Sequence, residues 1–363
     1  MSAITITVER IESVEPHPQA DRLELAKVAG TQTLIVKGQF KAGDLCVYFP
    51  PDICLPPDLS ERLGVQKCLK HALFDGQKIA CRVAATRLRG TPSYGFAQPL
   101  PACPELPRDV VPGQDVTTEF QATKYEPPVN VYQGGLASEP PNFHHYTDIQ
   151  HYRKYGHLLE AGMPVRITEK IHGMNSRVGR LKVDDDWQFV AGSHKTTRKQ
   201  IDPEGRQSVY WEPLQRAGVR QLLTEHTTAL GDDVILFGEL YDPGVQDLDY
   251  GIRAGEIGWR LFDITRAGRY LDWHEIKRFC QLYGIETVPL LYEGPFTPEL
   301  IAQLTYGPTM VAPSEEIACR FKDREGIVIT PLVERHAHIG RLILKNISAD
   351  YLDRPGAKDA GEL

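Results

Sequence analysis

The stretch Val165-Arg166-Ile167-Thr168-Glu169-Lys170-Ile171-His172-Gly173-Met174-Asn175 decides how this chain is interpreted. Its first residues form a β-rich run, which ends near Lys170. A lysine at the end of a strand can be held rigidly, and Gly173 lets the chain turn while its backbone approaches a phosphate. Because a short motif of this kind often occurs by chance, its meaning depends on the segments that follow it along the chain.

Four later segments carry a reactive side chain at the margin of an apolar run. They are Phe237-Gly238-Glu239-Leu240, Leu261-Phe262-Asp263-Ile264, Glu325-Gly326-Ile327-Val328-Ile329 and Leu342-Ile343-Leu344-Lys345. We expect strands to end at Glu239, Phe262 and Lys345, and a strand to begin after Glu325. Alone, each of these side chains is more often a solvated strand end, a surface ion pair or a core ring. Their joint order, with functional groups at strand margins, predicts a cleft.

Composition restricts the classes of protein. The chain has 363 residues, which fits two domains. The formal net charge of -7 excludes bulk positive charge as the basis of nucleic-acid binding, so such contacts must come from local patches. The seven cysteines lack paired C-x-x-C spacing, and we expect buried, reduced thiols. With no signal peptide or long apolar stretch, we expect a cytoplasmic protein without a membrane partner.

We expect an α+β chain with four regions. Residues 1–120 alternate between short apolar runs and turn formers, which predicts a small all-β domain whose strands close into a barrel. Residues 121–162 are rich in Pro, Gly and Tyr and are expected to form a connector. Residues 163–350 mix helix and strand patterns, and residues 351–363 form a tail. Expected elements are strands at Ile4–Ile11, Thr33–Val36, Leu45–Phe49, Val165–Ile167, Val234–Phe237, Trp259–Phe262, Gly326–Ile329 and Leu342–Leu344, and helices at Ile149–Leu159, Leu214–Leu230 and Trp273–Tyr283.

A first resemblance covers roughly the first hundred residues. The segments that carry it are His17-Pro18-Gln19-Ala20-Asp21-Arg22-Leu23, Ile35-Val36, Gly43-Asp44, Arg87-Leu88-Arg89-Gly90 and Ser93-Tyr94-Gly95. They resemble the tRNA-binding OB-fold that is appended to several synthetases. The resemblance implies an accessory domain that binds RNA on a concave face. Any single one of these residues could equally shape a turn.

A second resemblance covers roughly residues 150 to 350. The order of the lysine motif and the four later segments resembles the covalent nucleotidyltransferase superfamily of RNA ligases, DNA ligases and mRNA capping enzymes. Glu169-Lys170-Ile171-His172-Gly173-Met174-Asn175 is most similar to RNA ligases that seal nicks in duplex RNA. With an OB module first, the chain looks like the Deinococcus-type RNA ligase branch. This implies a nucleotidyltransferase (ATP-grasp-like ligase) domain of mixed antiparallel sheets and helices.

The resemblance implies roles for individual residues. Lys170 would attack the α-phosphorus of ATP as a free amine, so its pKa must be lowered by a nearby cation or by desolvation. Lys345 and a divalent metal, Mg or Mn, would supply that repulsion, while Glu239 and Glu325 would hold the metal. Phe262 would stack on adenine. The other residues expected to contact the nucleotide are Glu169, Ile171, His172, Asn175 and Arg153.

Contacts to RNA are expected from Asn175 and from the basic segment after it. That segment contains Ser193, His194, Lys195 and Arg198, where the family often has Ser-Arg, and it could equally be a solvated loop. A second departure is Ile343, which stands where the family commonly has a lysine. The residue that grips the 5'-phosphate therefore stays open.

We expect an ATP-dependent RNA ligase that acts as a monomer in RNA repair. Lysyl-AMP and RNA-adenylate intermediates would lead to sealing of 3'-OH and 5'-phosphate ends, with nicks in duplex RNA as the favoured substrate. A capping enzyme or DNA ligase would share Lys170, Glu239, Glu325 and Lys345, but both usually carry an OB domain after the last motif, and only eighteen residues follow Lys345. A non-catalytic RNA-binding protein is the other alternative, which the Ile343 departure favours and the intact lysine motif opposes.

Overall fold

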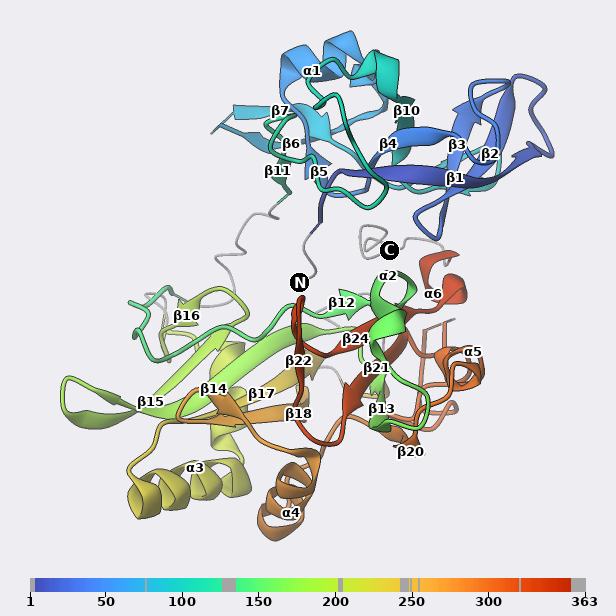
Figure 1. Cartoon of the computed structure of the whole chain (residues 1–363). Helices are drawn as coiled ribbons and strands as arrows, with labels where there is room; N and C mark the ends of the chain where they lie inside the picture. Colours follow the sequence, from blue (N-terminus) through green and yellow to red (C-terminus); the bar gives the residue numbers. More distant parts are fainter. Residues whose placement is uncertain are drawn as a thin grey trace. The chain divides into compact units, whose positions relative to one another are not determined.

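The computed structural model describes residues 4–75, 77–125, 135–201, 205–241, 248, 250–253, 255–319 and 321–353. Its contacts divide the chain into two units, one of residues 2–128 with 352–363 and one of residues 129–351 with Met1. Pro127, Pro128 and Gly134 of the expected connector, and residues 354–363 of the expected tail, lie outside the described residues. Figure 1 shows the elements of both units.

The N-terminal unit consists of two main sheets and a hairpin. The five-stranded sheet has the order β10 (Phe96–Pro99), β4 (Leu45–Phe49), β1 (Thr7–Pro16), β2 (Leu23–Val28), β3 (Thr31–Val36). The four-stranded sheet has the order β11 (Thr123–Lys124), β5 (Ile53–Cys54), β7 (Gln77–Arg82), β6 (Lys70–Phe74), and β8 (Thr86–Leu88) pairs with β9 (Thr91–Ser93). The helical segments are α1 (Pro57–Arg62) and short 3-10 turns at Gln66–Cys68 and Leu100–Ala102.

Alternating burial explains the strands of this unit. In β3 every second side chain is buried, as expected for a sheet with one covered face. Phe49 stacks on Phe96 with ring centroids 4.6 Å apart, inside a core that also contains Val8 and Val47. Gly95 allows this packing, because a Cβ there would lie 2.2 Å from the Phe49 carbonyl oxygen. The expected all-β domain is confirmed, with strands close to the predicted positions.

The second unit contains two larger sheets. The five-stranded sheet has the order β12 (Gln150–His151), β24 (Leu344–Ile347), β21 (Gly326–Pro331), β13 (Pro164–Lys170), β20 (Leu290–Pro295), with β12 parallel to β24 and the other pairs antiparallel. The six-stranded antiparallel sheet has the order β16 (Thr197–Arg198), β15 (Asp186–Ser193), β14 (Met174–Val183), β17 (Val234–Tyr241), β18 (Gly258–Arg266), β19 (Arg269–Tyr270). A small hairpin joins β22 (His336–Ala337) to β23 (Gly340–Arg341).

Helices cover the outer surfaces of these sheets. α3 (Ala217–Leu230) and α4 (Trp273–Tyr283) lie side by side on the six-stranded sheet (Figure 1), where Leu222 and Ile276 pack against Leu236. Both helices end at a glycine in the left-handed region, a residue that lacks the Cβ that disfavours this conformation. The remaining helical segments are α2 (Tyr152–Tyr155), α5 (Glu299–Thr305), α6 (Ala349–Asp353) and 3-10 turns at Gly156–Leu158 and Val209–Gln215. Among the described residues, no helix combines the length and apolarity needed to cross a bilayer.

The three strand ends expected from the sequence all lie inside strands. Glu239 is followed by two further residues of β17. β18 continues past Phe262 to Arg266, so Phe262 lies inside the strand and not at its end. The pattern was misleading because Asp263, which looks like a polar terminus, is buried and paired with Arg166 and Arg341. Likewise Lys345 is the second residue of β24, with strands on both sides, and it does not end a strand.

The segment before β13 is largely part of the second unit. Phe143 and Tyr146 are buried in an apolar cluster with Phe237, and Leu159 is buried in another with Ile167. The region expected to be a connector thus contains core residues over its described part. None of the seven cysteines forms a disulfide, and five of them are buried, which agrees with the expectation of reduced thiols.

Candidate active site

Lys170 is the last residue of β13, as the sequence predicts. It pairs with Gly326 of β21, and two residues earlier Thr168 pairs with Val328, which in turn pairs with Lys345 of β24. Cross-strand partners, and residues two apart on one strand, point to the same face of a sheet. The two lysines and Val328 therefore share one face of the five-stranded sheet.

Glu325 lies directly against Lys170. The Lys170 Nζ atom is 2.5 Å from Glu325 Oε1, and 155 residues of chain separate the pair. The side chain of Glu325 is only 2% exposed, whereas that of Lys170 is 20% exposed. The Lys170 side chain is therefore partly accessible, while the carboxylate that holds its amine is enclosed. Lys345 is itself 4% exposed, which places a second cation in a largely dehydrated part of the same sheet.

His172 is held by two tyrosines. Its Nδ1 atom is 2.7 Å from the Tyr351 hydroxyl and 3.8 Å from Glu325 Oε2, and its backbone N–H donates to the Tyr250 hydroxyl at 2.8 Å. Both tyrosines are buried, and burial raises the pKa of Tyr250 well above its ordinary value, so this phenol stays protonated. Sequence reasoning missed both, because neither lies in or next to a recognisable motif.

Gly173 allows the backbone of the lysine motif to approach β17 of the six-stranded sheet closely. A Cβ on Gly173 would lie 2.2 Å from the Leu240 carbonyl oxygen and 2.9 Å from Glu239 Cγ. Immediately after it, Asn175 of β14 pairs with Glu239 of β17, so their side chains share a face of the six-stranded sheet. Glu239 and Asn175 are thus brought together, and Glu239 is brought against the lysine motif. Ile171, between Lys170 and His172, is buried.

Phe262 and Val328 belong to one apolar cluster between the sheets. Both are partly buried against residues that include Phe237 and Ile343, and Phe262 meets Tyr146 edge to face at 4.9 Å. Ile343 is 2% exposed, so the position where the family commonly has a lysine contributes here to the core. The partly buried side chains of Phe262 and Val328 form an apolar surface suited to a planar ring.

Glu169 does not face the same way as Lys170. It is 1% exposed, it accepts a short hydrogen bond from the Thr309 hydroxyl, and its other oxygen accepts from the Met310 N–H at 2.7 Å. Burial raises the pKa of this carboxyl, although these hydrogen bonds oppose the rise. These contacts direct the Glu169 side chain to the loop at Thr309 and Met310. The expected contact of Glu169 with the nucleotide stays a prediction.

The expected RNA-binding residues are spread over a hairpin. Ser193 ends β15, and its hydroxyl lies 2.8 Å from that of Thr196. Lys195 is exposed in the turn, and His194 lies 6.0 Å from His145, ring to ring. Arg198 is only 2% exposed, with its guanidinium over the Tyr210 ring, so it belongs to the packed part of β16. Arg153, expected at the nucleotide, is exposed in α2.

Arg177 is a further charged residue that sequence reasoning missed. It is fully buried in β14 and donates to the Glu139 carboxylate at 2.6 Å and to the Ser193 carbonyl oxygen at 2.8 Å. It thereby fixes the segment that contains Phe143 against β15. The Asn-Ser-Arg sequence that follows the lysine motif was the one available signal.

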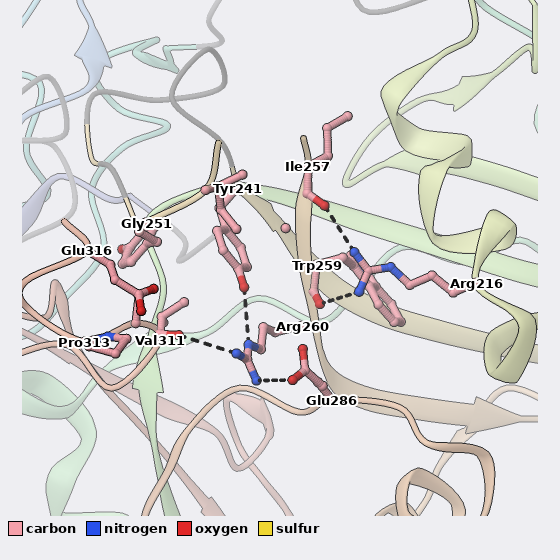
Figure 2. Close-up of a pocket in the computed structure, with 14 residues that line it drawn as sticks. Arg216, Tyr241, Gly251, Ile257, Trp259, Arg260, Glu286, Val311, Pro313 and Glu316 are labelled. Atoms are coloured by element: carbon pink, nitrogen blue, oxygen red, sulfur yellow. Dashed lines mark hydrogen bonds and ion pairs between the residues drawn. The ribbon is translucent and has the colours of Figure 1, made fainter. Parts of the chain in front are cut away.

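A cavity of about 270 Å³ lies on the side of the motif that Tyr250 occupies. Figure 2 shows Arg260 between the Tyr241 hydroxyl, the Glu286 carboxylate and the Val311 carbonyl oxygen, at 3.2, 3.5 and 3.4 Å. Tyr250 lines this cavity and also accepts the His172 N–H, so the cavity wall is joined to the lysine motif. Its other lining residues include Arg216, Ile257, Trp259, Ala312 and Glu316.

The chain is similar to known RNA ligases over its whole length. A family model described as RNA ligase matches residues 163–347, slightly more than half of the chain, and a model described as an OB-fold domain matches residues 5–100. The solved structure of Naegleria gruberi RNA ligase with PPi is 25% identical, covers 97% of this chain and 98% of that chain, and has a TM-score of 0.74. No curated protein matches.

Two variants of the same Naegleria gruberi enzyme give closely similar figures. One with AMP and Mn is 26% identical, with 96% of this chain and 99% of that chain covered and a TM-score of 0.74. One with ATP and Mn is 26% identical, with 96% of this chain and 100% of that chain covered and a TM-score of 0.75. The α+β architecture, with an OB-fold unit before a ligase unit, is thereby confirmed. The chain belongs to the RNA ligase family.

Proposed function

We propose that this protein joins RNA ends at the expense of ATP, through an adenylate carried on Lys170. The observation that carries the proposal is the Lys170 amine, which a partly exposed side chain holds 2.5 Å from an enclosed Glu325 carboxylate, on the sheet face that also carries Lys345.

ATP and a divalent cation are the implied partners, as in the Naegleria structures with ATP and Mn. Adenine would lie on the surface formed by Phe262 and Val328. The described residues contain no cluster of three or more His, Cys, Asp or Glu side chains suited to a metal. Glu325 and Glu239 would therefore supply hard oxygen ligands, with phosphate and water completing the shell, which suits Mg or Mn. When bound, the cation would neutralise charge on the phosphates.

The reaction would proceed in three displacements. The Lys170 amine attacks the α-phosphorus of ATP, the bond to the bridging oxygen breaks, and pyrophosphate leaves. Before this attack the amine must lose a proton. The nearby Glu325 carboxylate stabilises the protonated amine, so loss of the proton is favoured only when other cations bind that carboxylate in its place. An RNA 5'-phosphate then takes the adenylyl group and frees Lys170, and a 3'-hydroxyl displaces AMP to form the phosphodiester. Lys345 would stabilise the negative charge that develops in these steps.

The RNA substrate is proposed to be a nicked duplex or another structured end. The net charge of -7 requires local contacts, and the hairpin that carries Ser193, His194 and Lys195 together with Asn175 offers them. The OB-fold unit would bind RNA beyond the break. Action as a monomer in the cytoplasm, in RNA repair, is part of the same proposal.

Labelled nucleotides and defined substrates test this function. Lys170→Ala should abolish transfer of label from α-labelled ATP to the protein, whereas Lys195→Ala, which removes an exposed lysine, should label normally and seal RNA less well. Label from GTP instead of ATP would indicate a capping enzyme, and label from neither would indicate a binding protein. Nicked duplexes should be sealed faster than single strands, and only with RNA on the 3'-hydroxyl side; equal sealing of all-DNA nicks would contradict the assignment.

A further inference from the structure

The His172 side chain is held by a buried tyrosine. Its ring meets the Tyr351 ring at a centroid distance of 5.4 Å and an interplanar angle of 65°, in addition to the bond of 2.7 Å between Nδ1 and the hydroxyl. His172 is 5% exposed and Tyr351 is fully buried. Turning the imidazole over would carry Nδ1 away from the hydroxyl, so Tyr351 selects one orientation of the ring.

The same orientation sets the relation between His172 and the nucleophile. Nδ1 lies 3.8 Å from Glu325 Oε2, while the other oxygen of Glu325 accepts from Lys170. The imidazole therefore contacts the same carboxylate that holds the attacking amine. Tyr351, His172, Glu325 and Lys170 form a continuous row of contacts.

The backbone around Tyr351 is tied to Glu325 as well. Ser348, three residues before Tyr351, donates its N–H to the Glu325 carbonyl oxygen at 2.8 Å, and Ile347 pairs with Gly326 at the start of β21. The segment from Ile347 to Tyr351 thus holds the main chain of Glu325 and the side chain of His172 together. Removal of one hydroxyl should loosen the ring without disturbing this backbone.

We propose that Tyr351 is a positioning residue of the adenylation step, acting through His172. This inference rests on the proposed function, because it needs a lysyl-adenylate to be formed. Tyr351 holds the imidazole with Nδ1 at 3.8 Å from Glu325 Oε2, while the Tyr250 hydroxyl accepts the backbone N–H of His172. The end of the ligase unit thereby contributes to a site whose nucleophile lies 181 residues earlier.

A double-mutant cycle tests the inference. Single-turnover formation of lysyl-adenylate is measured at saturating ATP for the wild type, Tyr351→Phe, His172→Ala and the double variant. Loss of one oriented hydrogen bond should slow Tyr351→Phe about tenfold with little change in the KM for ATP. The double variant should be no slower than His172→Ala, since Tyr351 acts through that ring. Tyr306→Phe, at an exposed tyrosine, is the matched control and should react at the wild-type rate.

The other outcomes distinguish failure of the proposed function from failure of the positioning role. A wild type that forms no lysyl-adenylate overturns the proposed function. A labelled wild type with an equally fast Tyr351→Phe overturns the positioning role alone. Multiplying losses in the double variant would show that Tyr351 acts by general support of the fold, as would a fall in thermal stability large enough to unfold Tyr351→Phe at the assay temperature.

Discussion

Asp263→Asn should destabilise the ligase unit by about 3 kcal/mol. Asp263 lies in β18, and its oxygens accept from Arg166 of β13 at 2.7 Å and from Arg341 of β23 at 2.8 and 3.2 Å, with a further short hydrogen bond from Tyr146. All of this lies within a core where the Asp263 side chain is 1% exposed. The carboxylate therefore links the two sheets of the unit through buried ion pairs.

The size of the destabilisation depends on the partners that remain for each arginine after the substitution. Removing one partner of a buried pair costs about 3 to 5 kcal/mol, because the other charge stays buried. Arg341 retains Glu334, and Arg166 retains the Trp273 ring at 4.3 Å, so the lower end of that range applies. Glu334→Gln is the matched control, since Arg341 would keep Asp263; the loss should be about 1 kcal/mol.

Urea unfolding followed by tryptophan fluorescence reports this unit selectively. All four tryptophans, Trp187, Trp211, Trp259 and Trp273, lie in residues 129–351. Burial alone would raise the pKa of Asp263, but Arg341 and Arg166 bring it below its usual range. Its stabilising effect is thus present at neutral pH and is lost as the pH falls below about 4 toward the folded-state pKa. A variant within 1 kcal/mol of the wild type, or an unchanged acid dependence, would refute this reasoning.

Three further changes probe the site. Gly173→Ala should abolish lysyl-adenylate formation, because its Cβ would meet the Leu240 carbonyl oxygen at 2.2 Å; adenylation at half the wild-type rate or more would contradict this. Phe262→Ala should raise the KM for ATP about tenfold through loss of a stacking surface, measured by initial adenylation rates; an unchanged KM would place adenine elsewhere. Glu169→Gln should unfold at higher urea than the wild type at alkaline pH. Burial raises the pKa of Glu169, so its contribution to folding decreases as the pH rises through that value; a variant less stable at every pH would refute this.

The extent to which sequence reasoning succeeded depended on how local the signal was. Lys170 at the end of β13 and Glu325 before β21 were predictable, because strand margins follow from short runs of apolar residues. α4 was predicted to the residue, since its amphipathic spacing and Gly284 are both local. The OB-fold unit followed from closely spaced strands and turns.

Buried charges were the main source of error. Asp263 resembled a strand end, yet its pairing with Arg341, far along the chain, allows it to lie inside β18. Lys345 was expected to end a strand but is the second residue of β24 and is buried. Glu169 was expected to contact the nucleotide from the family resemblance; alternation along β13 turns its side chain toward Thr309, and the contact itself stays a prediction. The residues next to such a side chain in the sequence do not indicate which distant residue it will contact.

The tyrosines around His172 illustrate the same limit. Tyr250 and Tyr351 lie 78 and 179 residues after His172, outside any motif, and only the folded chain brings their hydroxyls to it. Ile343 was noticed as a departure from the family, but its place in the apolar cluster with Phe237 could not be foreseen.

Mapping of the adenylate on the protein tests the central claim most directly. The purified chain is incubated with ATP and Mn without RNA, digested, and examined by mass spectrometry for the peptide that carries AMP. The adenylyl group should be found on Lys170, and addition of a 5'-phosphorylated nicked RNA should remove it as sealed product forms. An adduct on another lysine, or a chain that stays unmodified while RNA is sealed, would contradict the account.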